Sequence, residues 1–204
     1  MSPGRWARIV AGVQRRTLRR TRVVVLRATP TNDAIAMPAG CALVRIDVAA
    51  GDAGERHAER AMQAVGEASG LVAARLAHGD ELLGWQEGDD IVSFGWLRHR
   101  ERMVGSVRLV DAPGRCFLYN FHTRADRRGR RLYPALLLAL RSLLGREGVR
   151  ELFAEVNVHN AASARGAERA GFVPVGELAW LTLADRWTTA ATASRRDGHA
   201  ACPF

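Results

Sequence analysis

The most informative part of this sequence is the stretch Arg127-Arg128-Gly129-Arg130-Arg131-Leu132-Tyr133-Pro134. It follows a strand-like run at 116–123 and opens an apolar helix predicted over 135–144. The first backbone N–H groups of a helix have no intrahelical partner, and the helix dipole favours negative charge at that end. A tight glycine-containing turn between a strand and a helix, with four arginines in it, therefore predicts an anion site suited to phosphate groups.

A second motif follows this helix. It reads Val156-Asn157-Val158-His159-Asn160-Ala161-Ala162-Ser163 and continues to Arg169-Ala170-Gly171-Phe172. The pattern is typical of a strand end, a polar corner at Asn160, one short helix, a glycine stop and a new strand. Each motif alone is weakly specific, but the two in this order, with a strand and a helix between them, narrow the choice of fold considerably.

Together the motifs resemble those of the GNAT superfamily of acyl-CoA N-acyltransferases. The first motif of that family is Arg/Gln-x-x-Gly-x-Gly/Ala at the head of a long helix, and residues 128–133 cover it. Arg131 and Tyr133 stand where the commonest family pattern has glycine. The second family motif, Asn-x-x-Ser/Ala followed by Gly-Phe, is matched by the segment from Asn160 to Phe172. The resemblance runs from about residue 91 to residue 183 and fades upstream.

The resemblance implies an α/β (α+β) fold: a single domain with a mixed, mostly antiparallel central sheet flanked by helices. From the residue patterns we expect two short helices within 52–76, broken near Gly66–Gly70. Strands are predicted at 23–28, 42–48, 91–97, 103–110, 116–123 and 152–158, with a closing hairpin of 172–175 and 178–183. We divide the chain into a basic amphipathic arm (1–22), the acyltransferase-like domain (23–187) and a disordered tail (188–204).

The resemblance also implies acetyl-CoA, or another short acyl-CoA, as co-substrate, and no metal. The fourth main strand of the family splays from the fifth, so that the backbone of residues 119–123 would pair with the pantetheine arm and the turn would hold the pyrophosphate. The expected cofactor-binding residues are Phe121, Thr123, Arg128, Gly129, Arg130, Arg131, Leu132, Tyr133, Asn160, Ser163 and Arg165.

The chain departs from the family at one catalytic position. Many members have a tyrosine seven residues after the motif asparagine, as the acid that protonates the departing thiolate, and here that position is Ala167. The nearest substitutes by sequence are Tyr133, Tyr119 and His122, of which Tyr133 is expected mainly to pack its ring at the cofactor turn.

The expected catalytic residues are His122, Glu155 and Tyr119. His122 is the imidazole on the cofactor strand and can take a proton from the amine, directly or through water. Glu155 on the neighbouring strand can hold a cationic acceptor if it points inward. A structural role for each of these side chains is the open alternative.

The positive charge is concentrated at the N-terminal end. All 30 basic residues are arginine, and the formal net charge is +9. Residues 1–31 hold eight of these arginines and no acid, and the other 173 residues hold 22 arginines against 21 acids. The globular part is therefore close to neutral, which argues against specific nucleic-acid binding. The apolar positions of the arm from Trp6 to Val13 have helical spacing, so it either docks on the domain or makes weak contact with anionic membranes.

Three functions remain in view. The favoured one is transfer of an acetyl or short acyl group from acyl-CoA to a primary amine of a small molecule or protein. The alternatives are a domain that binds CoA without turnover and a basic adaptor that binds anionic membrane or nucleic acid through residues 1–22. Three widely spaced cysteines without a metal pattern fit a reducing compartment, and we expect a cytoplasmic protein. The sequence indicates neither the acceptor nor the oligomeric state.

Overall fold

The computed structural model describes residues 18–68, 70–104, 107–110, 112–183 and 187–195. Within these residues, one sheet contains eight strands in the order β10-β9-β1-β8-β7-β4-β3-β2. The strands are β1 (Leu18–Ala28), β2 (Ala42–Ile46), β3 (Glu81–Glu87), β4 (Asp90–Arg98), β7 (Arg115–Thr123), β8 (Glu151–Asn157), β9 (Val173–Leu183) and β10 (Trp187–Arg195). All neighbours are antiparallel except β7 and β8, which run parallel. The predicted mixed, mostly antiparallel sheet is confirmed.

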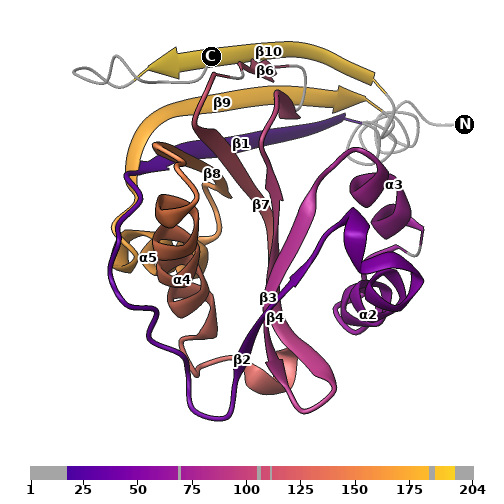
Figure 1. Ribbon diagram of the computed structural model, residues 1–204. Helices are drawn as coiled ribbons and strands as arrows, with labels where there is room; N and C mark the ends of the chain where they lie inside the picture. The colour runs from indigo at the N-terminus through magenta and orange to yellow at the C-terminus, as the bar shows by residue number, and fades with distance from the viewer. Residues whose placement is uncertain (1–17, 69, 105–106, 111, 184–186, 196–204) are drawn as a thin grey trace, which may run out of the picture.

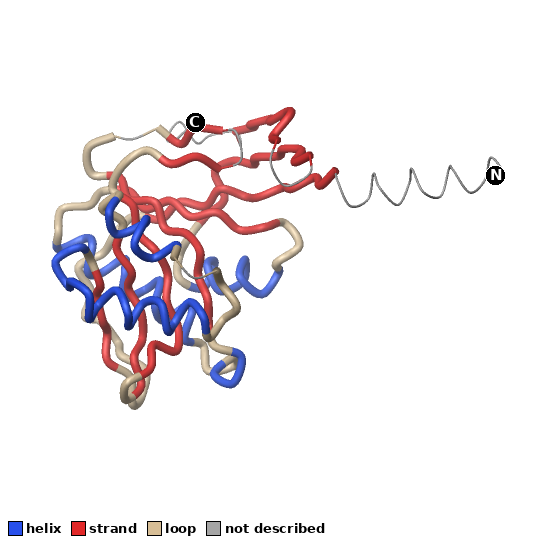
Figure 2. Tube along the Cα trace, turned by 90° about the vertical axis from the view of Figure 1, so that its right-hand side faces the viewer, coloured by secondary structure: helices blue, strands red, loops and turns tan. Residues whose placement is uncertain are grey.

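Helices cover both faces of this sheet (Figure 1). Helices α4 (Leu132–Arg146) and α5 (Ala161–Arg169) lie against one face, and α2 (Gly51–Gln63) and α3 (Leu71–Ala77) lie against the other. Two 3₁₀ turns, η1 (Val48–Ala50) and η2 (Ala125–Arg127), precede helices. The turned view shows the helices gathered against one part of the sheet, with the long strands extending beyond them (Figure 2).

Helix α4 forms because leucines and alanines recur at helical spacing and most of them pack against the sheet, while Leu138 faces solvent. Pro134 lies in the first turn, where its missing N–H removes no helical hydrogen bond. The buried side chains of α4 include Leu136, Leu137 and Leu140, and they pack with Trp85 of β3 and other residues of the largest core cluster. The Trp85 indole N–H also donates to the Leu132 carbonyl at 3.1 Å, which fixes the start of α4 on the sheet.

Two further clusters fill the opposite face. One joins α2 and α3 to the sheet through Met62, Leu76, Phe94 and Trp96. The other lies under a short hairpin of β5 (Arg102–Val104) and β6 (Val107–Leu109), which covers β1, β8 and β9.

Strands β7 and β8 pair along only the first half of β7 and then diverge. Their pairing runs from Arg115↔Glu151 to Leu118↔Ala154 and includes no later residue of β7. On its other side β7 bulges against β4, because Tyr119 pairs with Trp96 while His122 pairs with Phe94. The bulge places Asn120 in the left-handed region at φ 51°. These two irregularities open the sheet beside the last residues of β7.

Several strand predictions need correction. Residues 103–110 are not one strand but the β5–β6 hairpin, and the predicted hairpin of 172–175 and 178–183 is the single strand β9. Gly176, which lies between the two predicted strands, is instead part of β9 and lies next to a register shift in the pairing with β1. Strand β3 was not predicted, since both of its faces are buried at residues 82–85 and the sequence there does not alternate.

The ends of the chain also differ from expectation. The predicted disordered tail is wrong for residues 188–195, which belong to β10 and pair with β9. The arm boundary at residue 22 is wrong as well, because β1 begins at Leu18 and pairs with β9 from that residue. The predicted amphipathic helix from Trp6 to Val13 lies outside the described residues.

Candidate active site

A pocket of about 740 Å³ opens where β7 parts from β8 and the two motifs meet. Four segments enclose it: the end of β7, the arginine turn (residues 127–131), the first turn of α4, and α5. The lining residues are Phe121, His122, Thr123, Arg127, Arg128, Gly129, Arg131, Leu132, Tyr133, Pro134, Asn160, Ala162, Ser163, Arg165, Gly166 and Arg169. Ten of the eleven residues predicted to bind the cofactor are therefore brought together, and Arg130 is the exception.

The backbone of the arginine turn has the shape that the sequence indicated. Gly129 lies at φ 80°, and Arg131 lies at φ 59° although it carries a side chain. Arg131 caps α4 without any side-chain hydrogen bond to the helix, and the first helical bond within it joins the Ala135 N–H to the Arg131 carbonyl. The N–H groups of Leu132 and Tyr133 thus remain available at the positive end of the helix dipole, beside the pocket.

The arginines of this turn divide into two groups. Arg127 pairs with Glu87 at 2.7 Å and Asp126 at 2.9 Å, and Arg130 pairs with Glu87 at 2.5 Å. Among the described residues no carboxylate pairs with Arg128 or Arg131. The expectation that all four guanidinium groups serve a phosphate needs correction, because two of them are largely neutralised by internal acids. Helix α5 adds the exposed Arg165 and Arg169 to the wall of the pocket.

The second motif forms the opposite wall. The Asn160 side chain accepts a hydrogen bond from the Ser163 backbone N–H at 3.0 Å and so caps α5. The Ser163 hydroxyl donates to the Tyr133 hydroxyl at 3.2 Å, which ties α5 to the start of α4. Asn160 therefore has a structural role as the N-cap of α5, and this role also positions its side chain at the pocket.

The Tyr133 ring lines the pocket and packs against two of its other walls. It meets the Phe121 ring edge-on with 5.4 Å between centroids, and it lies so close to α5 that a Cβ at Gly166 would stand 2.6 Å from it. The predicted packing role of this ring is therefore seen directly. Burial raises the pKa of the Tyr133 phenol, although the Ser163 hydrogen bond lowers it. The phenol accepts from Ser163 and keeps its own proton free to donate into the pocket.

His122 lies at the junction between this pocket and the other face of the sheet. Its Nε2 is 3.1 Å from the Glu67 Oε1 atom and 3.0 Å from the Asn120 amide. The Asn120 amide is best oriented with its nitrogen toward His122, because its oxygen then accepts from Arg75 at 2.9 Å. In this arrangement neutral Nε2 accepts from Asn120, and protonated Nε2 donates to Glu67. Both protonation states of the imidazole have a partner, which suits a group that takes up and releases a proton.

The pKa of His122 is set by competing surroundings. Burial lowers it, Glu67 raises it, and Arg75 lowers it further, with a net fall below the ordinary value. The imidazole is therefore mainly neutral at neutral pH and able to accept a proton.

Tyr119 and Glu155 do not line the pocket. The Tyr119 hydroxyl donates at 2.5 Å to the carboxylate of Asp80, which is 0% exposed and also holds Arg98 at 2.6 and 2.5 Å. Burial, together with Asp80, raises the pKa of Tyr119 far above its ordinary value. Glu155 pairs with Arg102, whose guanidinium stacks over the Tyr119 ring at 4.1 Å. Both residues serve a structural charge network, and of the three predicted catalytic side chains the structure brings His122 to the pocket.

Glu67 and Arg75 were not anticipated from the sequence. Glu67 follows α2 in the break between the two short helices, and Arg75 is the single arginine of the seven-residue helix α3. Neither position carries a motif, so their approach to His122 depends on the packing of α3 against β4 and β7.

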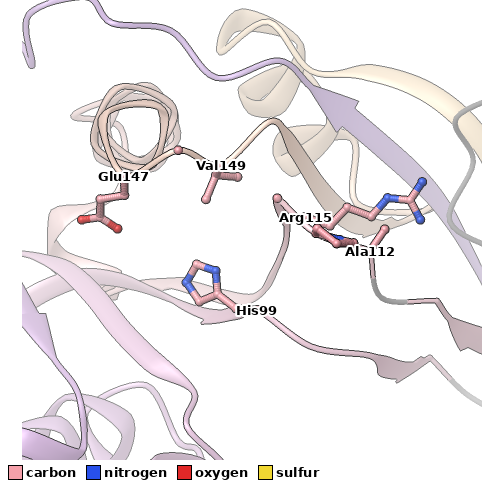
Figure 3. A pocket seen from close by; sticks show the side chains of 8 residues that line it. His99, Ala112, Arg115, Glu147 and Val149 are labelled. Atoms are coloured by element: carbon pink, nitrogen blue, oxygen red, sulfur yellow. The ribbon is translucent and has the colours of Figure 1, made fainter.

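A smaller pocket of about 390 Å³ lies at the other ends of β7 and α4. His99 and Glu147 face it from different elements, whereas the Arg115 side chain points away from them (Figure 3). Glu147 is already paired with Arg45 at 2.6 Å and Arg115 with Glu151 at 2.9 Å. The charged groups around this pocket thus have internal partners.

The chain belongs to the GNAT acetyltransferase family, because the family model of that description matches residues 49–172, more than half of the sequence. The match begins before α2 and ends after α5, and so includes the arginine turn, the second motif, Glu67 and Arg75. The resemblance inferred from the two motifs is thereby confirmed.

Solved structures with the same fold are distant in sequence. A GCN5-related N-acetyltransferase from Sphaerobacter thermophilus is 16% identical with a TM-score of 0.59, and the superposition covers 93% of this chain and 57% of the chain of that structure. An acetyltransferase of the GNAT family from Colwellia psychrerythraea is 12% identical with a TM-score of 0.57, covering 86% and 61%. A tandem GNAT protein from the clavulanic acid biosynthesis pathway is 18% identical with a TM-score of 0.54, covering 90% and 59%. The chain thus spans about three fifths of these structures. No curated protein matches it.

The described residues lack both a metal-ligand cluster and a membrane-spanning helix. They contain no cluster of three or more histidine, cysteine or acidic side chains arranged to hold a metal ion. They also contain no helix long and apolar enough to cross a bilayer.

Proposed function

We propose that this protein transfers an acetyl or short acyl group from acyl-CoA to a primary amine. The observation that carries the proposal is the coincidence, in one pocket, of the arginine turn with a neutral, half-buried imidazole at the end of β7. The free N–H groups at the start of α4, with Arg128 and Arg131, are suited to the pyrophosphate of CoA. The opening between β7 and β8 leaves backbone groups of β7 available to the pantetheine amides.

The reaction requires three things of the site. The amine nitrogen attacks the thioester carbon, a C–N bond forms, and the C–S bond breaks with release of the CoA thiolate. The proton lost by the amine passes to His122, directly or through water, and the thiolate takes up a proton to leave as CoA. A backbone N–H near Phe121 is suited to stabilise the oxyanion that develops on the carbonyl.

We assign the protonation of the thiolate to Tyr133. The family tyrosine is replaced by Ala167, which is fully buried in the core, and Tyr119 is engaged with Asp80. Tyr133 is the phenol on the pocket wall, and its raised pKa keeps the proton in place at neutral pH. The phenol can therefore donate a hydrogen bond to the sulfur as the C–S bond breaks, and solvent resupplies the proton that leaves with CoA. This moves the acid from α5 to the start of α4.

The experiment that tests this function combines binding with turnover. Calorimetry of the purified chain with acetyl-CoA should give a one-to-one isotherm, and a thiol reagent should detect CoA release that depends on an added amine. Tight binding without release, across amino acids, polyamines, amino sugars and peptides, would favour the second candidate, a CoA-binding domain without turnover. The observation behind that candidate is the loss of the family tyrosine at Ala167.

A further inference from the structure

A compact group of opposite charges lies on the α3 face of the sheet, next to the pocket described above. We call Glu67, Arg75, Asn120 and His122 the α3-side cluster. Its members come from three segments: the turn after α2, helix α3 and the end of β7. Hydrogen bonds link the four side chains in a row. Arg75 contacts Asn120 at 2.9 Å, Asn120 contacts His122 at 3.0 Å, and His122 contacts Glu67 at 3.1 Å.

Arg75 differs from the arginines around it. Its half-buried guanidinium stacks over the Trp96 ring at 4.9 Å and the Tyr119 ring at 5.4 Å. Its neighbours Arg98 and Arg102 each have a carboxylate partner, Asp80 and Glu155 respectively, but no described carboxylate forms an ion pair with Arg75. A partly buried guanidinium normally recovers the cost of its desolvation from an anion. Burial lowers the pKa of Arg75, and the Glu67 and Asp80 carboxylates raise it through space but form no direct ion pair with the guanidinium. The guanidinium, held on a rigid aromatic platform, is therefore able to bind a carboxylate from outside.

The other end of the cluster has the opposite character. Glu67 is 27% exposed in its side chain, and among the described residues its ion-pair partner is the mainly neutral His122. An ammonium group next to this carboxylate would gain a charge-assisted hydrogen bond, and loss of its proton would then be assisted by the adjacent imidazole. The cluster therefore presents a cationic pole and an anionic pole, separated by the Asn120 amide.

His122 connects these poles to the acyl-CoA pocket, because it belongs to the cluster and also lines the pocket. An amine held between Glu67 and His122 would lie at the end of β7, where the strand has parted from β8. Acceptors that carry several positive charges are disfavoured there, since Arg75 lies on the same face and repels a second cation, whereas Arg98 and Arg102 are paired with Asp80 and Glu155.

Building on the function proposed above, we infer that the acceptor is an amine with a carboxylate a few bonds from the nitrogen, as in an amino acid. Arg75 binds the carboxylate, and Glu67 with His122 receives the amine. The natural side chain of the acceptor is left open, but the charge pattern separates this class from polyamines, aminoglycosides and protein lysines.

The test uses sets of acceptors that differ in the carboxylate alone. Glycine is compared with glycinamide and methylamine, and L-phenylalanine with L-phenylalaninamide and phenethylamine. Initial rates of CoA release are measured for the full chain, the Arg75→Gln and Arg75→Lys variants, and the control Arg60→Gln, which alters an exposed arginine near the end of α2. Calorimetric titration of each acceptor into CoA-loaded protein, or into the free chain if CoA does not bind, follows acceptor binding without turnover.

We expect kcat/KM for the carboxylate-bearing member to exceed that of its amide by tenfold or more in the best set. Arg75→Gln should remove this preference by raising KM, Arg75→Lys should restore part of it, and Arg60→Gln should leave it unchanged. Acetyl-CoA affinity should stay within about threefold in all variants, since Arg75 does not line the acyl-CoA pocket.

The outcomes separate this inference from the function on which it rests. Failure to bind acetyl-CoA refutes the proposed function, and preferential binding of carboxylate-bearing amines to the free chain would still support the acceptor site. Equal binding of acid and amide, or a preference that survives Arg75→Gln in a folded variant, overturns the inference even if the enzyme is active. Unchanged circular dichroism and melting temperature identify the folded variants.

Discussion

The arginine turn and the α3-side cluster lie at the same end of β7, but they present their charged and polar groups by different means. The turn relies on backbone, because Gly129 and Arg131 take positive φ angles and the first N–H groups of α4 are free. The α3-side cluster relies on side chains from three segments, held by contacts with Trp96, Tyr119 and one another. A backbone site recognises what every acyl-CoA shares, while a side-chain site can differ between members of one family. Under the proposed function, one side of β7 would serve the part of the reaction common to the family, and the other side the part specific to the acceptor.

The largest effect is expected from His122, where the two regions meet. His122→Ala should lower kcat by roughly 10²–10⁴-fold, because the amine loses its proton acceptor. Acetyl-CoA affinity should change little, since the turn that we propose to hold the phosphates stays intact. Rapid measurement of CoA release, alongside calorimetry, separates the two parameters.

The pH dependence of kcat, measured for the wild type and for His122→Ala, tests the same role of His122 more specifically. The neutral imidazole is the active form, so kcat of the wild type should rise with pH through the pKa of His122, which burial places below its ordinary value. The variant should lack that inflection. His99→Ala is the control, since His99 lines the smaller pocket at the far end of β7 and should leave kcat and its pH profile unchanged. A fall in kcat of under threefold in His122→Ala would assign proton removal to water or to Glu67.

The next largest effect is expected from a substitution within the arginine turn. Gly129→Glu should weaken acetyl-CoA binding by about a hundredfold, or about 2.8 kcal/mol, because it places a negative charge at the phosphate site. Gly148→Glu is a matched control: Gly148 lies at φ 83° against 80° for Gly129, and neither has an atom within 4 Å of its missing Cβ. Calorimetry should therefore show similar losses of stability in both variants but weakened binding in Gly129→Glu alone. Equal affinities would remove the turn from the cofactor site.

The same contrast explains how far the sequence could predict the site. The arginine turn and Asn160 were found because a backbone site needs glycine, caps and fixed spacing, which a single sequence displays. Glu67 and Arg75 were missed because an acid in a helix break and an arginine on a short helix look like ordinary surface residues. Tyr119 and Glu155 were chosen for position on the correct strands, but the sequence did not reveal that Asp80 and Arg102 would engage them.

A smaller effect is expected from the phenol on the cofactor side. Tyr133→Phe keeps the ring against Phe121 and Gly166 but removes the proton donor, so kcat should fall by about tenfold, at the low end of acid–base contributions. KM for acetyl-CoA should stay within about twofold, as the packing surface is preserved.

Tyr119→Phe should have the reverse effect, with a loss of stability and little change in kcat. It removes a donor from the buried Asp80 carboxylate, so it should lower the free energy of unfolding by about 1–3 kcal/mol. Its kcat should remain within about threefold of wild type, because Tyr119 does not line the pocket. Chemical denaturation and steady-state rates measured on both variants test the assignment. Loss of kcat in Tyr119→Phe without loss in Tyr133→Phe would exchange the two roles.

The smallest effect on either region is expected from deletion of residues 1–17. This segment carries four arginines and no acid, but the strand β1 begins at Leu18, and the pocket is lined by residues between 121 and 169. Exposed charges farther from a site than a Debye length, about 10 Å at 0.1 M salt, are screened from it. Acetyl-CoA affinity and the preference for carboxylate-bearing amines should both stay within about threefold of the full chain. Any sedimentation with phosphatidylserine vesicles at low salt should be lost, since each basic residue near such a surface contributes about 1 kcal/mol. A truncated chain that loses its melting transition would instead show that residues 1–17 stabilise the domain.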